Sequence, residues 1–476
     1  MRFFKHLSYR TLFTKAVMGI SVICLFASDG LTVSATTIKE ENIAYNQSLA
    51  VQSNAVANWP TGPVISAESA ILMDADTGAI LYAKNIHQKE YPASTTKILT
   101  TLIASERCSM DEIVDFSYDA VHDIDPGSNH IAIEPGEQLT MEECLNAILI
   151  RSANEVSFAV AEHISGTTWQ DFGDIMNERA KELGCVDSHF VNPNGLHDPD
   201  HYTTAYDMAL ITKEALTSKT FREYASETYH EIPPTNMNNE TRYLTQGNRM
   251  MLSNSEYYYP ACQGGKTGYT DDAGGTLVVW AEKNDMQLIC VTMGAPDNAT
   301  NYTDSIALFN YVFNNYSNTT LLSDYEFDAE AATTAQNFLN DYYGCENLGT
   351  MHLSVDNNQP FIFANNADRT KLQMNFVPSA DRLDEGYIGT LEVSYEGTTC
   401  LTLPVSYSGY VNSNDDVAVA EAYKNGSIRP ALIKEKKSYW KYIIAAVVVA
   451  CILGLFIYAN VIEPRKRKQN SRSRRR

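Results

Sequence analysis

Two groups of short apolar runs, one on each side of a long helical stretch, constrain the fold of this chain more than any other feature. The first group is Ala70–Asp74 and Ala79–Ala83, which flank the turn residues 76–78 and have the pattern of a β-hairpin. The second group, Gly275–Glu282 and Met286–Met293, also predicts two strands. Because strands precede and follow the helices, we expect an α+β domain whose sheet is built from both ends of this region. The helices are expected at about residues 93–105, 141–150, 156–164, 169–183 and 305–313.

Residues 1–35 have the pattern of a secretory signal peptide. Basic residues precede the apolar run Ala16–Ala27, and Val33-Ser34-Ala35 resembles a small-residue cleavage site. The apolar run is short for a membrane span, which needs ~20 residues. Cleavage is therefore favoured over the alternative, a retained membrane anchor.

Residues 442–462 predict a transmembrane helix. This segment is apolar apart from Asn460 and is long enough to cross a bilayer. A strongly basic tail, residues 463–476, follows it directly. The positive-inside rule places that tail in the cytoplasm and the preceding residues outside. We therefore expect a single-pass protein of the cell membrane whose main domain is extracytoplasmic; a buried core helix is the less favoured alternative.

Charge is distributed unevenly along the 476 residues. The formal net charge is −22, yet 13 of the 36 Lys and Arg residues lie before residue 36 or after residue 437. Basic ends around an acidic middle fit two membrane signals that flank an exported domain. An acidic domain repels a polyanion, so nucleic acid is not expected as a partner.

The nine cysteines do not form a recognisable framework. Cys24 lies in the signal and Cys451 in the predicted span, and the other seven show no C-x-x-C spacing. This is neither a disulfide scaffold nor a zinc pattern, and we expect no metal and no cofactor. Cys345 and Cys400 fall in one later region, where they either form a disulfide or pack as small hydrophobic side chains.

The composition and the hydrophobic pattern along the sequence also predict the order of the domains. Residues 36–60 are a polar spacer, and residues 61–318 form the main domain. Residues 322–410 hold short apolar runs divided by turn residues, which predicts a small all-β domain. Residues 411–437 are polar and are expected to form a stalk before the transmembrane helix and the tail, 463–476.

The first motif with catalytic potential is Ser94-Thr95-Thr96-Lys97, at the expected start of a helix. Residues three apart share a helix face, so the Lys97 amine can reach the Ser94 hydroxyl. A serine becomes a good nucleophile when a base takes its proton, and a lysine can do this if burial or a nearby cation lowers its pKa. The helix N-terminus also directs N–H groups toward an attacked carbonyl. Taken alone, the pattern also fits an ordinary helix start.

The second motif is Ser152-Ala153-Asn154, between two expected helices. A second hydroxyl near the first serine and lysine can relay protons, and an Asn side chain can hold a substrate amide. By itself this short pattern carries almost no information.

The third motif is Lys266-Thr267-Gly268, which two glycines precede and a strand pattern follows. Glycines in a strand allow close approach of another backbone, here that of a substrate. Lys266 supplies positive charge and Thr267 a hydroxyl for a carboxylate.

In the order S-x-x-K, S-x-N and K-T-G, the motifs resemble those of the penicillin-recognising serine enzymes. Their surroundings are most similar to the serine D-alanyl-D-alanine carboxypeptidases, the low-molecular-mass penicillin-binding proteins. The similarity extends over about residues 60–318 and is carried by Tyr91–Lys97, Glu134–Glu137, Phe190–Leu196 and Gly265–Thr270. It implies a β-lactamase/transpeptidase-like domain, an antiparallel sheet flanked by helices, followed by a small β domain and a C-terminal membrane attachment.

The resemblance also implies an activity and a role for each site residue. Such an enzyme removes the terminal D-alanine from peptidoglycan stem pentapeptides through an acyl-enzyme and is acylated by β-lactams. The oxyanion hole would consist of the backbone N–H groups of Ser94 and Tyr269. The implied site comprises the nucleophile Ser94, its base Lys97, the relay and positioning residues Ser152 and Asn154, the carboxylate-binding residues Lys266 and Thr267 with Gly268, then Tyr269, and Arg249.

One departure from the family concerns carboxylate recognition. The family often has a second arginine after the strand that follows K-T-G, but no arginine lies between Arg249 and Arg369 here. Recognition of the substrate carboxylate must then depend on Lys266, Thr267 and Arg249.

Two other functions share part of the pattern. A class A β-lactamase needs a glutamate four residues before an asparagine and after the S-x-N motif. Glu142 and Asn146 have this spacing but precede Ser152, so we interpret them as structural helix residues. The other alternative is a non-catalytic cell-wall-binding protein, against which the three intact motifs argue.

Overall fold

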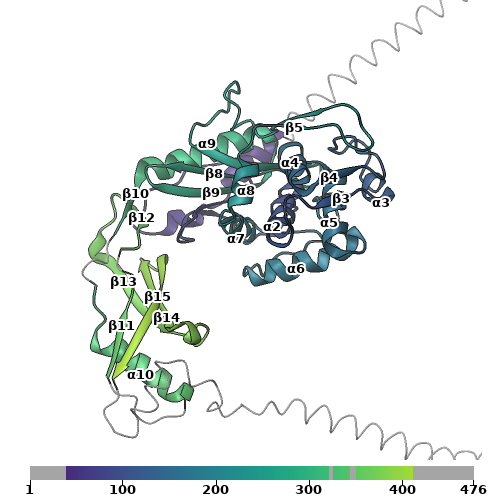
Figure 1. Cartoon of the computed structure of the whole chain (residues 1–476). Coiled ribbons are helices and arrows are strands. Elements are labelled where there is room, and N and C mark those ends of the chain that lie inside the picture. Colours follow the sequence, from purple (N-terminus) through teal and green to yellow (C-terminus); the bar gives the residue numbers. More distant parts are fainter. Residues whose placement is uncertain (1–38, 321–324, 344–349, 357, 411–476) are drawn as a thin grey trace, which may run out of the picture. The chain divides into compact units, whose positions relative to one another are not determined.

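The computed structural model describes residues 39–320, 325–343, 350–356 and 358–410, which form two compact units (Figure 1). The first unit runs to Tyr325 and adds Asp356–Asn375 and Leu391–Leu403. The second consists of Glu326–Val355, Phe376–Thr390 and the described residues from Pro404 onward.

The predicted signal peptide, stalk, transmembrane helix and basic tail lie outside the described residues. Within the described ranges, none of the helices combines the length and the apolar character that crossing a membrane requires.

A helix at residues 39–48 precedes the main domain, whose helices and strands follow the predicted order, strands first, helices next and strands again. As far as Thr319 they are β1 (Ser69–Asp74), β2 (Ile80–Lys84), the 3-10 turn η2 (Ala93–Thr96), α2 (Lys97–Arg107), β3 (Ile113–Asp115), α3 (Tyr118–His122), β4 (Gln138–Thr140), α4 (Met141–Arg151), α5 (Asn154–Ser165), α6 (Phe172–Glu182), α7 (Ala205–Ala215), α8 (Lys219–Ala225), β5 (Tyr229–Ile232), β6 (Arg242–Thr245), β7 (Cys262–Thr270), β8 (Gly274–Lys283), β9 (Met286–Ala295), α9 (Asn298–Asn315) and β10 (Tyr316–Thr319). After these come α10 (Ala329–Tyr343), β11 (Thr350–Ser354), β12 (Phe361–Ala364), β13 (Leu372–Pro378), β14 (Tyr387–Tyr395) and β15 (Thr398–Tyr410).

A five-stranded antiparallel sheet in the order β2-β1-β9-β8-β7 forms the centre of the first unit. Strand β1 pairs with β9, so that Ala70 lies opposite Thr292 although more than two hundred residues separate them in the chain. The prediction of a sheet built from both ends of this region is therefore confirmed. Strand β7, which contains the K-T-G motif, is an edge strand of this sheet.

The sheet is covered on both faces because its central strands alternate apolar side chains toward two separate cores. In β8, Val278 and Trp280 join the core that includes residues of α2, α4, α5 and α7. Leu277 and Val279 join the core on the other face, with residues of α9. Alternation with period two places successive side chains on opposite faces. Figure 1 shows α9 on one side of β8 and β9 and α7 with α2 on the other.

Helix α4 places the S-x-N motif. It begins with a capping box, in which Thr140 Oγ1 accepts from the Glu143 backbone N–H at 3.2 Å and Glu143 Oε2 accepts from the Thr140 N–H at 2.7 Å. It ends at Ser152, whose φ of +59° lies in the left-handed region and stops the helix. Helix α5 then begins at Asn154.

The stretch 322–410 is not all-β, and this part of the predicted fold is wrong. Helix α10 lies within it, and its alanine-rich sequence has a high intrinsic helix propensity. Ala335 and Leu339, four residues apart on one helix face, are buried. Four of the remaining strands form a sheet in the order β11-β15-β14-β13. Cys400 is a buried, free cysteine, whereas Cys345 lies outside the described residues.

Candidate active site

Ser94 lies in the 3-10 turn η2, directly before the helix that Lys97 begins. The turn is fixed from two sides, because Thr95 Oγ1 donates to the Pro92 carbonyl at 2.7 Å and Thr276 Oγ1, from β8, donates to the same oxygen at 2.9 Å. Ala93, the residue before the serine, has a left-handed φ of +48°. A non-glycine residue in that region carries backbone strain that persists only where the surroundings enforce it.

The Lys97 amine is fully buried and contacts three oxygen atoms. Its Nζ lies 3.0 Å from Ser94 Oγ, donates to Asn154 Oδ1 at 2.7 Å and donates to the Asn194 carbonyl at 2.6 Å. A neutral amine has two N–H groups and one lone pair. A hydroxyl can accept or donate, so these three partners suit a neutral amine whose lone pair faces the serine, and they equally suit a charged ammonium that donates to all three oxygens.

The surroundings also disfavour a charge on Lys97. Burial holds the pKa of Lys97 well below its usual range, and the nearby Lys266 lowers it further, while Glu155 acts in the opposite direction. Burial also raises the pKa of Glu155, which favours the neutral carboxyl group. A neutral Glu155 no longer raises the pKa of Lys97. The electrostatics thus favour a neutral amine beside Ser94, and the hydrogen-bond geometry allows it.

The junction of α4 and α5 places Asn154 against Lys97, and Ser152 lies two residues before Asn154. Asn154 is buried, and its amide oxygen accepts from Lys97. The Ser152 hydroxyl is also buried, and within the described part of the chain it has no hydrogen-bond partner. A hydroxyl without a fixed partner at a reactive centre is free to accept and pass on a proton.

Strand β7 runs directly past the serine. A Cβ atom added to Gly268 would lie 2.9 Å from the Ser94 backbone nitrogen and 2.3 Å from Thr276 Oγ1, so a side chain at this position would be excluded. Lys266 is buried on the same strand, and its Nζ donates to the Thr267 carbonyl at 2.8 Å. Burial lowers the pKa of Lys266 to about 7. The pKa of Lys266, like that of Lys97, is therefore lowered because the amine is removed from water.

The pairing of Ser94 with the buried Lys97, next to an edge strand that carries K-T-G, agrees with the sequence resemblance. Residues 55–297 match the D-alanyl-D-alanine carboxypeptidase family, Peptidase_S11. The chain belongs to this family.

Known carboxypeptidases of the family agree with this assignment. Over 252 residues, the chain is 36% identical to the D-alanyl-D-alanine carboxypeptidase DacF of Bacillus subtilis, and the match covers 52% of this chain and 63% of that protein. It is 32% identical over 259 residues to DacC of Escherichia coli, covering 53% of this chain and 62% of DacC. These matches span less than two thirds of the relatives' own length.

Solved structures share the fold. The crystal structure of penicillin-binding protein 5 from Haemophilus influenzae superposes with a TM-score of 0.58, at 23% identity, over 74% of this chain and 99% of that one. Penicillin-binding protein 6B from Escherichia coli gives a TM-score of 0.54, also at 23% identity, over 73% and 98% of the two chains. The penicillin-binding, transpeptidase-like α+β fold is thereby confirmed.

The segment Phe190–Leu196, to which the sequence alone assigned no role, supplies one of the hydrogen bonds to the base. Asn194 contributes its backbone carbonyl to Lys97. Gly195 has a φ of +78°, and a Cβ atom there would lie 1.8 Å from the Ala93 carbonyl oxygen. Only glycine allows this loop to pack against the nucleophile turn.

His201 locks that loop to the nucleophile turn. Its Nδ1 accepts from the Val191 backbone N–H at 3.0 Å, which leaves the proton on Nε2, 2.9 Å from Thr96 Oγ1. Burial lowers the pKa of His201 to about 3, so the ring is neutral and this pattern is fixed at ordinary pH.

The segment Glu134–Glu137 is structural rather than part of the site. The Glu137 carboxylate is buried and accepts from Arg242 Nη1 at 2.7 Å and Nη2 at 2.9 Å, and from Thr235 Oγ1 at 2.7 Å. Burial alone would raise the pKa of Glu137, but the hydrogen bonds from Arg242 and Thr235 keep it below its usual range. This paired charge holds the start of α4 against β6.

Arg249 does not join the other predicted residues. Its guanidinium pairs with Glu256 Oε1 at 3.1 Å and lies over the Tyr257 ring at 4.6 Å from the centroid. Both partners of the ion pair are largely exposed. Tyr269 is also exposed, and its hydroxyl lies 3.5 Å from Asp271 Oδ1.

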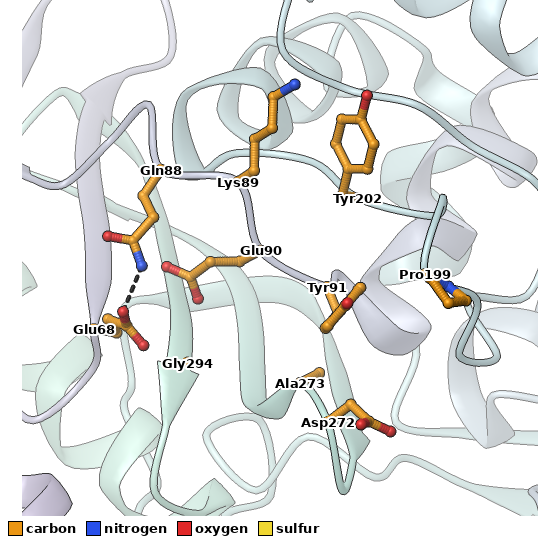
Figure 2. Close-up of a pocket in the computed structure, with 10 residues that line it drawn as sticks. All are labelled: Glu68, Gln88, Lys89, Glu90, Tyr91, Pro199, Tyr202, Asp272, Ala273 and Gly294. Carbon is orange, nitrogen blue, oxygen red and sulfur yellow. Dashed lines mark hydrogen bonds between the residues drawn. The ribbon is translucent and has the colours of Figure 1, made fainter.

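A pocket of about 330 Å³ lies beside the nucleophile segment (Figure 2). Tyr91, just before the S-x-x-K motif, and Asp272, just after β7, contribute to its lining. Figure 2 shows the Glu68 and Glu90 side chains close together, with Gln88 donating to Glu68. Burial, opposed by a hydrogen bond from Ser69, raises the pKa of Glu90 to about 7. The pocket therefore offers acidic groups close to the nucleophile segment, and Ser94 is not among its lining residues.

The glutamate that a class A β-lactamase would need is not at the site. Glu142 lies exposed in the first turn of α4, whereas Ser152 caps the other end of that helix. Ten residues of helix separate them by roughly 15 Å. Asn146 Nδ2 donates to the Glu142 carbonyl within the helix, at 3.1 Å, which agrees with a structural role for both residues.

Proposed function

We propose that this protein is a serine D-alanyl-D-alanine carboxypeptidase that removes the terminal D-alanine from peptidoglycan stem pentapeptides. One observation carries the proposal: the fully buried Lys97 amine lies 3.0 Å from Ser94 Oγ while two carbonyl oxygens take its N–H groups. That arrangement leaves the amine lone pair for the serine proton. The family membership supplies the reaction class.

In the proposed reaction, Lys97 takes the Ser94 proton as Oγ attacks the carbonyl of the penultimate D-alanine. The backbone N–H groups of Ser94 and Tyr269 are proposed to hold the developing oxyanion, a stabilisation usually worth about 2.7–4 kcal/mol for each donor. The peptide C–N bond breaks, and the terminal D-alanine leaves as an amine after it receives a proton. Water then cleaves the ester and regenerates Ser94.

Ser152 and Lys266 are proposed to serve the leaving group. The Ser152 hydroxyl has no other partner among the described residues, so it is suited to pass the proton from Lys97 to the departing amine. Lys266 and Thr267 would bind the terminal carboxylate, with Asn154 positioning the peptide. When the carboxylate arrives, it would raise the pKa of Lys266 from about 7 and restore its charge. A role for Arg249 requires it to leave Glu256.

We also propose that the protein is exported and anchored in the cell membrane by residues 442–462, with residues 1–35 removed as a signal peptide. The apolar segment and the basic tail support this topology. Residues 322–410 would hold the enzyme away from the membrane or contact the wall, because they contain none of the motif residues. Truncation before Ser438 should release the protein from membranes after signal cleavage, and retention there would place the anchor elsewhere.

The reaction can be tested by incubating the protein with a muropeptide that ends in D-Ala-D-Ala and weighing the products. We expect loss of one alanine, and no loss with Ser94→Ala. β-Lactams should label Ser94 stably. Rapid turnover of a penicillin would instead support a β-lactamase, and neither labelling nor alanine release would support a non-catalytic wall-binding protein.

A further inference from the structure

Three side chains of metal-ligand type converge at the C-terminal ends of α2 and α5. Cys108 is the residue that ends α2, His163 lies in the last turn of α5, and Glu112 lies in the loop before β3. The sulfur, an imidazole nitrogen and a carboxylate oxygen all lie within 4.8 Å of one another. All three residues are half-buried, and none of them contributes to the proposed reaction.

The three ligand atoms are close to the spacing that a zinc ion needs. His163 Nε2 lies 2.8 Å from Glu112 Oε2. Tetrahedral zinc bonds of 2.0–2.3 Å place neighbouring ligand atoms about 3.3–3.7 Å apart, so small side-chain movements suffice. The other oxygen of Glu112 accepts from the Ser109 N–H at 2.6 Å, a supporting hydrogen bond of the kind that orients metal ligands.

We propose that Cys108, Glu112 and His163 form a zinc-binding site with a fourth position open to water. One thiolate, one imidazole and one carboxylate are the ligand types that zinc accepts, and hard cations such as Mg²⁺ do not favour a thiolate. On binding, Cys108 releases its thiol proton to solvent, and His163 Nε2 gives up the proton it shares with Glu112, which moves to Nδ1 through solvent, so that Nε2 and the Glu112 carboxylate each bond the ion.

The site would connect two helices whose other ends lie at the active site. Helix α2 begins with Lys97 and α5 begins with Asn154, and these two residues share a hydrogen bond of 2.7 Å. Cys108 and His163 stand at the opposite ends, roughly 16 Å away along an eleven-residue helix. An ion bound there would tie together the pair of helices that holds Lys97 against Asn154, and would stabilise the folded state by mass action.

The sequence does not reveal this site because its third ligand, His163, is far in the chain from Cys108 and Glu112. Glu112 and His163 are 51 positions apart, and no short C-x-x-C or H-x-x-x-H spacing joins them. Only the packing of α5 against α2 brings them together.

The proposal is tested on the full chain, freed of metal with a chelator and titrated with Co²⁺ and then Zn²⁺. We expect one equivalent of Co²⁺ to produce a thiolate-to-cobalt charge-transfer band that Zn²⁺ displaces, and Zn²⁺ to raise the melting temperature. Cys108→Ala and His163→Ala should weaken binding by at least the ~10–100-fold that loss of a supporting group costs. Cys262→Ala, at another half-buried thiol, and His230→Ala, in another His–Glu pair, are the matched controls and should bind normally.

Absence of saturable binding, or binding that survives Cys108→Ala, overturns the proposal. If Cys108→Ala lowers the melting temperature of the metal-free protein, weaker binding could come from lost stability. The test then uses Glu112→Gln, which keeps the size of the side chain and removes the charged ligand. Weaker Zn²⁺ binding by Glu112→Gln with unchanged metal-free melting supports the site, and unchanged binding contradicts it.

Discussion

Two buried lysines, Lys84 at the end of β2 and Lys97 at the start of α2, are both hidden from water but differ in the oxygen atoms and the charges around them. Lys84 Nζ donates to the backbone carbonyls of Asn46, Ile65 and Ala67 at 2.7, 3.1 and 2.6 Å. Three acceptors require three N–H groups, which only the charged ammonium has. Lys84 is therefore held as a cation that joins three stretches of backbone.

The charges around the two lysines also differ in sign. Burial lowers the pKa of Lys84 to about 8, and the acidic Asp304, Glu68 and Glu90 oppose the change. At Lys97 burial is reinforced by Lys266, and the third partner is a hydroxyl that can donate. Burial alone does not create a base. The identity of the acceptors and the sign of the neighbouring charges decide whether a buried lysine is a structural cation or a proton acceptor.

The largest effect is expected for Lys97→Arg. A guanidinium keeps the charge but cannot act as a base, so acylation by penicillin should fall by about 10³-fold or more, within the range of general base catalysis. Stopped-flow labelling measures this. Lys84→Arg is the matched control, and its acylation rate should stay close to that of the unchanged protein. Normal acylation by Lys97→Arg would refute the assignment of the base.

The opposite pattern, lower stability with acylation retained, is expected for Lys84→Met. Removing this cation leaves three buried carbonyls without their donor and the nearby Asp304 carboxylate without a compensating charge, so the free energy of unfolding should fall by roughly 3–5 kcal/mol. The folded fraction should still be acylated. Lys97→Met should unfold at nearly the original urea concentration but remain unlabelled. If Lys84→Met is as stable as the unchanged protein, Lys84 is not a structural cation and its contrast with Lys97 is wrong.

A smaller effect is expected for Asn154→Asp, which replaces an amide oxygen 2.7 Å from Lys97 Nζ by a carboxylate oxygen. The added negative charge should raise the pKa of Lys97. Acylation near neutral pH should slow by about tenfold, for a shift of one pKa unit, and should recover as the pH rises. A uniform loss of rate at all pH values would mean that Asn154 acts on the substrate instead.

The smallest effect is expected for Lys266→Arg. In the free protein Lys266 has a pKa of about 7, so its charge, which favours a substrate carboxylate, is present below that pH and is lost above it. KM for a D-Ala-D-Ala peptide should therefore rise as the pH increases through 7. The arginine variant should retain part of the activity and lose most of this pH dependence. A greater loss of activity in Lys266→Arg than in Lys97→Arg would refute the roles of Lys97 as the base and Lys266 as the carboxylate-binding cation.

Much of the site could be predicted from the sequence because helix geometry fixes it locally. Ser94 and Lys97 are three residues apart at a helix start, and Ser152 and Asn154 lie at a helix junction that a capping box and a left-handed residue define. The strands at both ends of the domain were recognisable from their period and their turns. These features depend on neighbours in the chain.

The remaining features depend on contacts between distant segments. The Asn194 carbonyl reaches Lys97 from 97 positions away, and the carbonyls around Lys84 belong to backbone without a side-chain signature. The lowered pKa of Lys266 follows from burial, which the K-T-G motif does not predict. Helix α10 was missed because alanines, which favour helices, do not stand out as an apolar stripe. The role of Arg249 stays a prediction from the family match, and in this structure its side chain pairs with Glu256.

The measurement that tests the central claim most directly is the pH dependence of the acylation rate constant with a penicillin. If the surroundings keep Lys97 neutral, the rate should rise through an apparent pKa well below the reference value of about 10.4 for lysine and then level off. A rate that continues to rise tenfold per pH unit up to pH ~10 would show a lysine still charged at neutral pH. Lys97 would then be a structural cation like Lys84, and the proposed base would have to be another group.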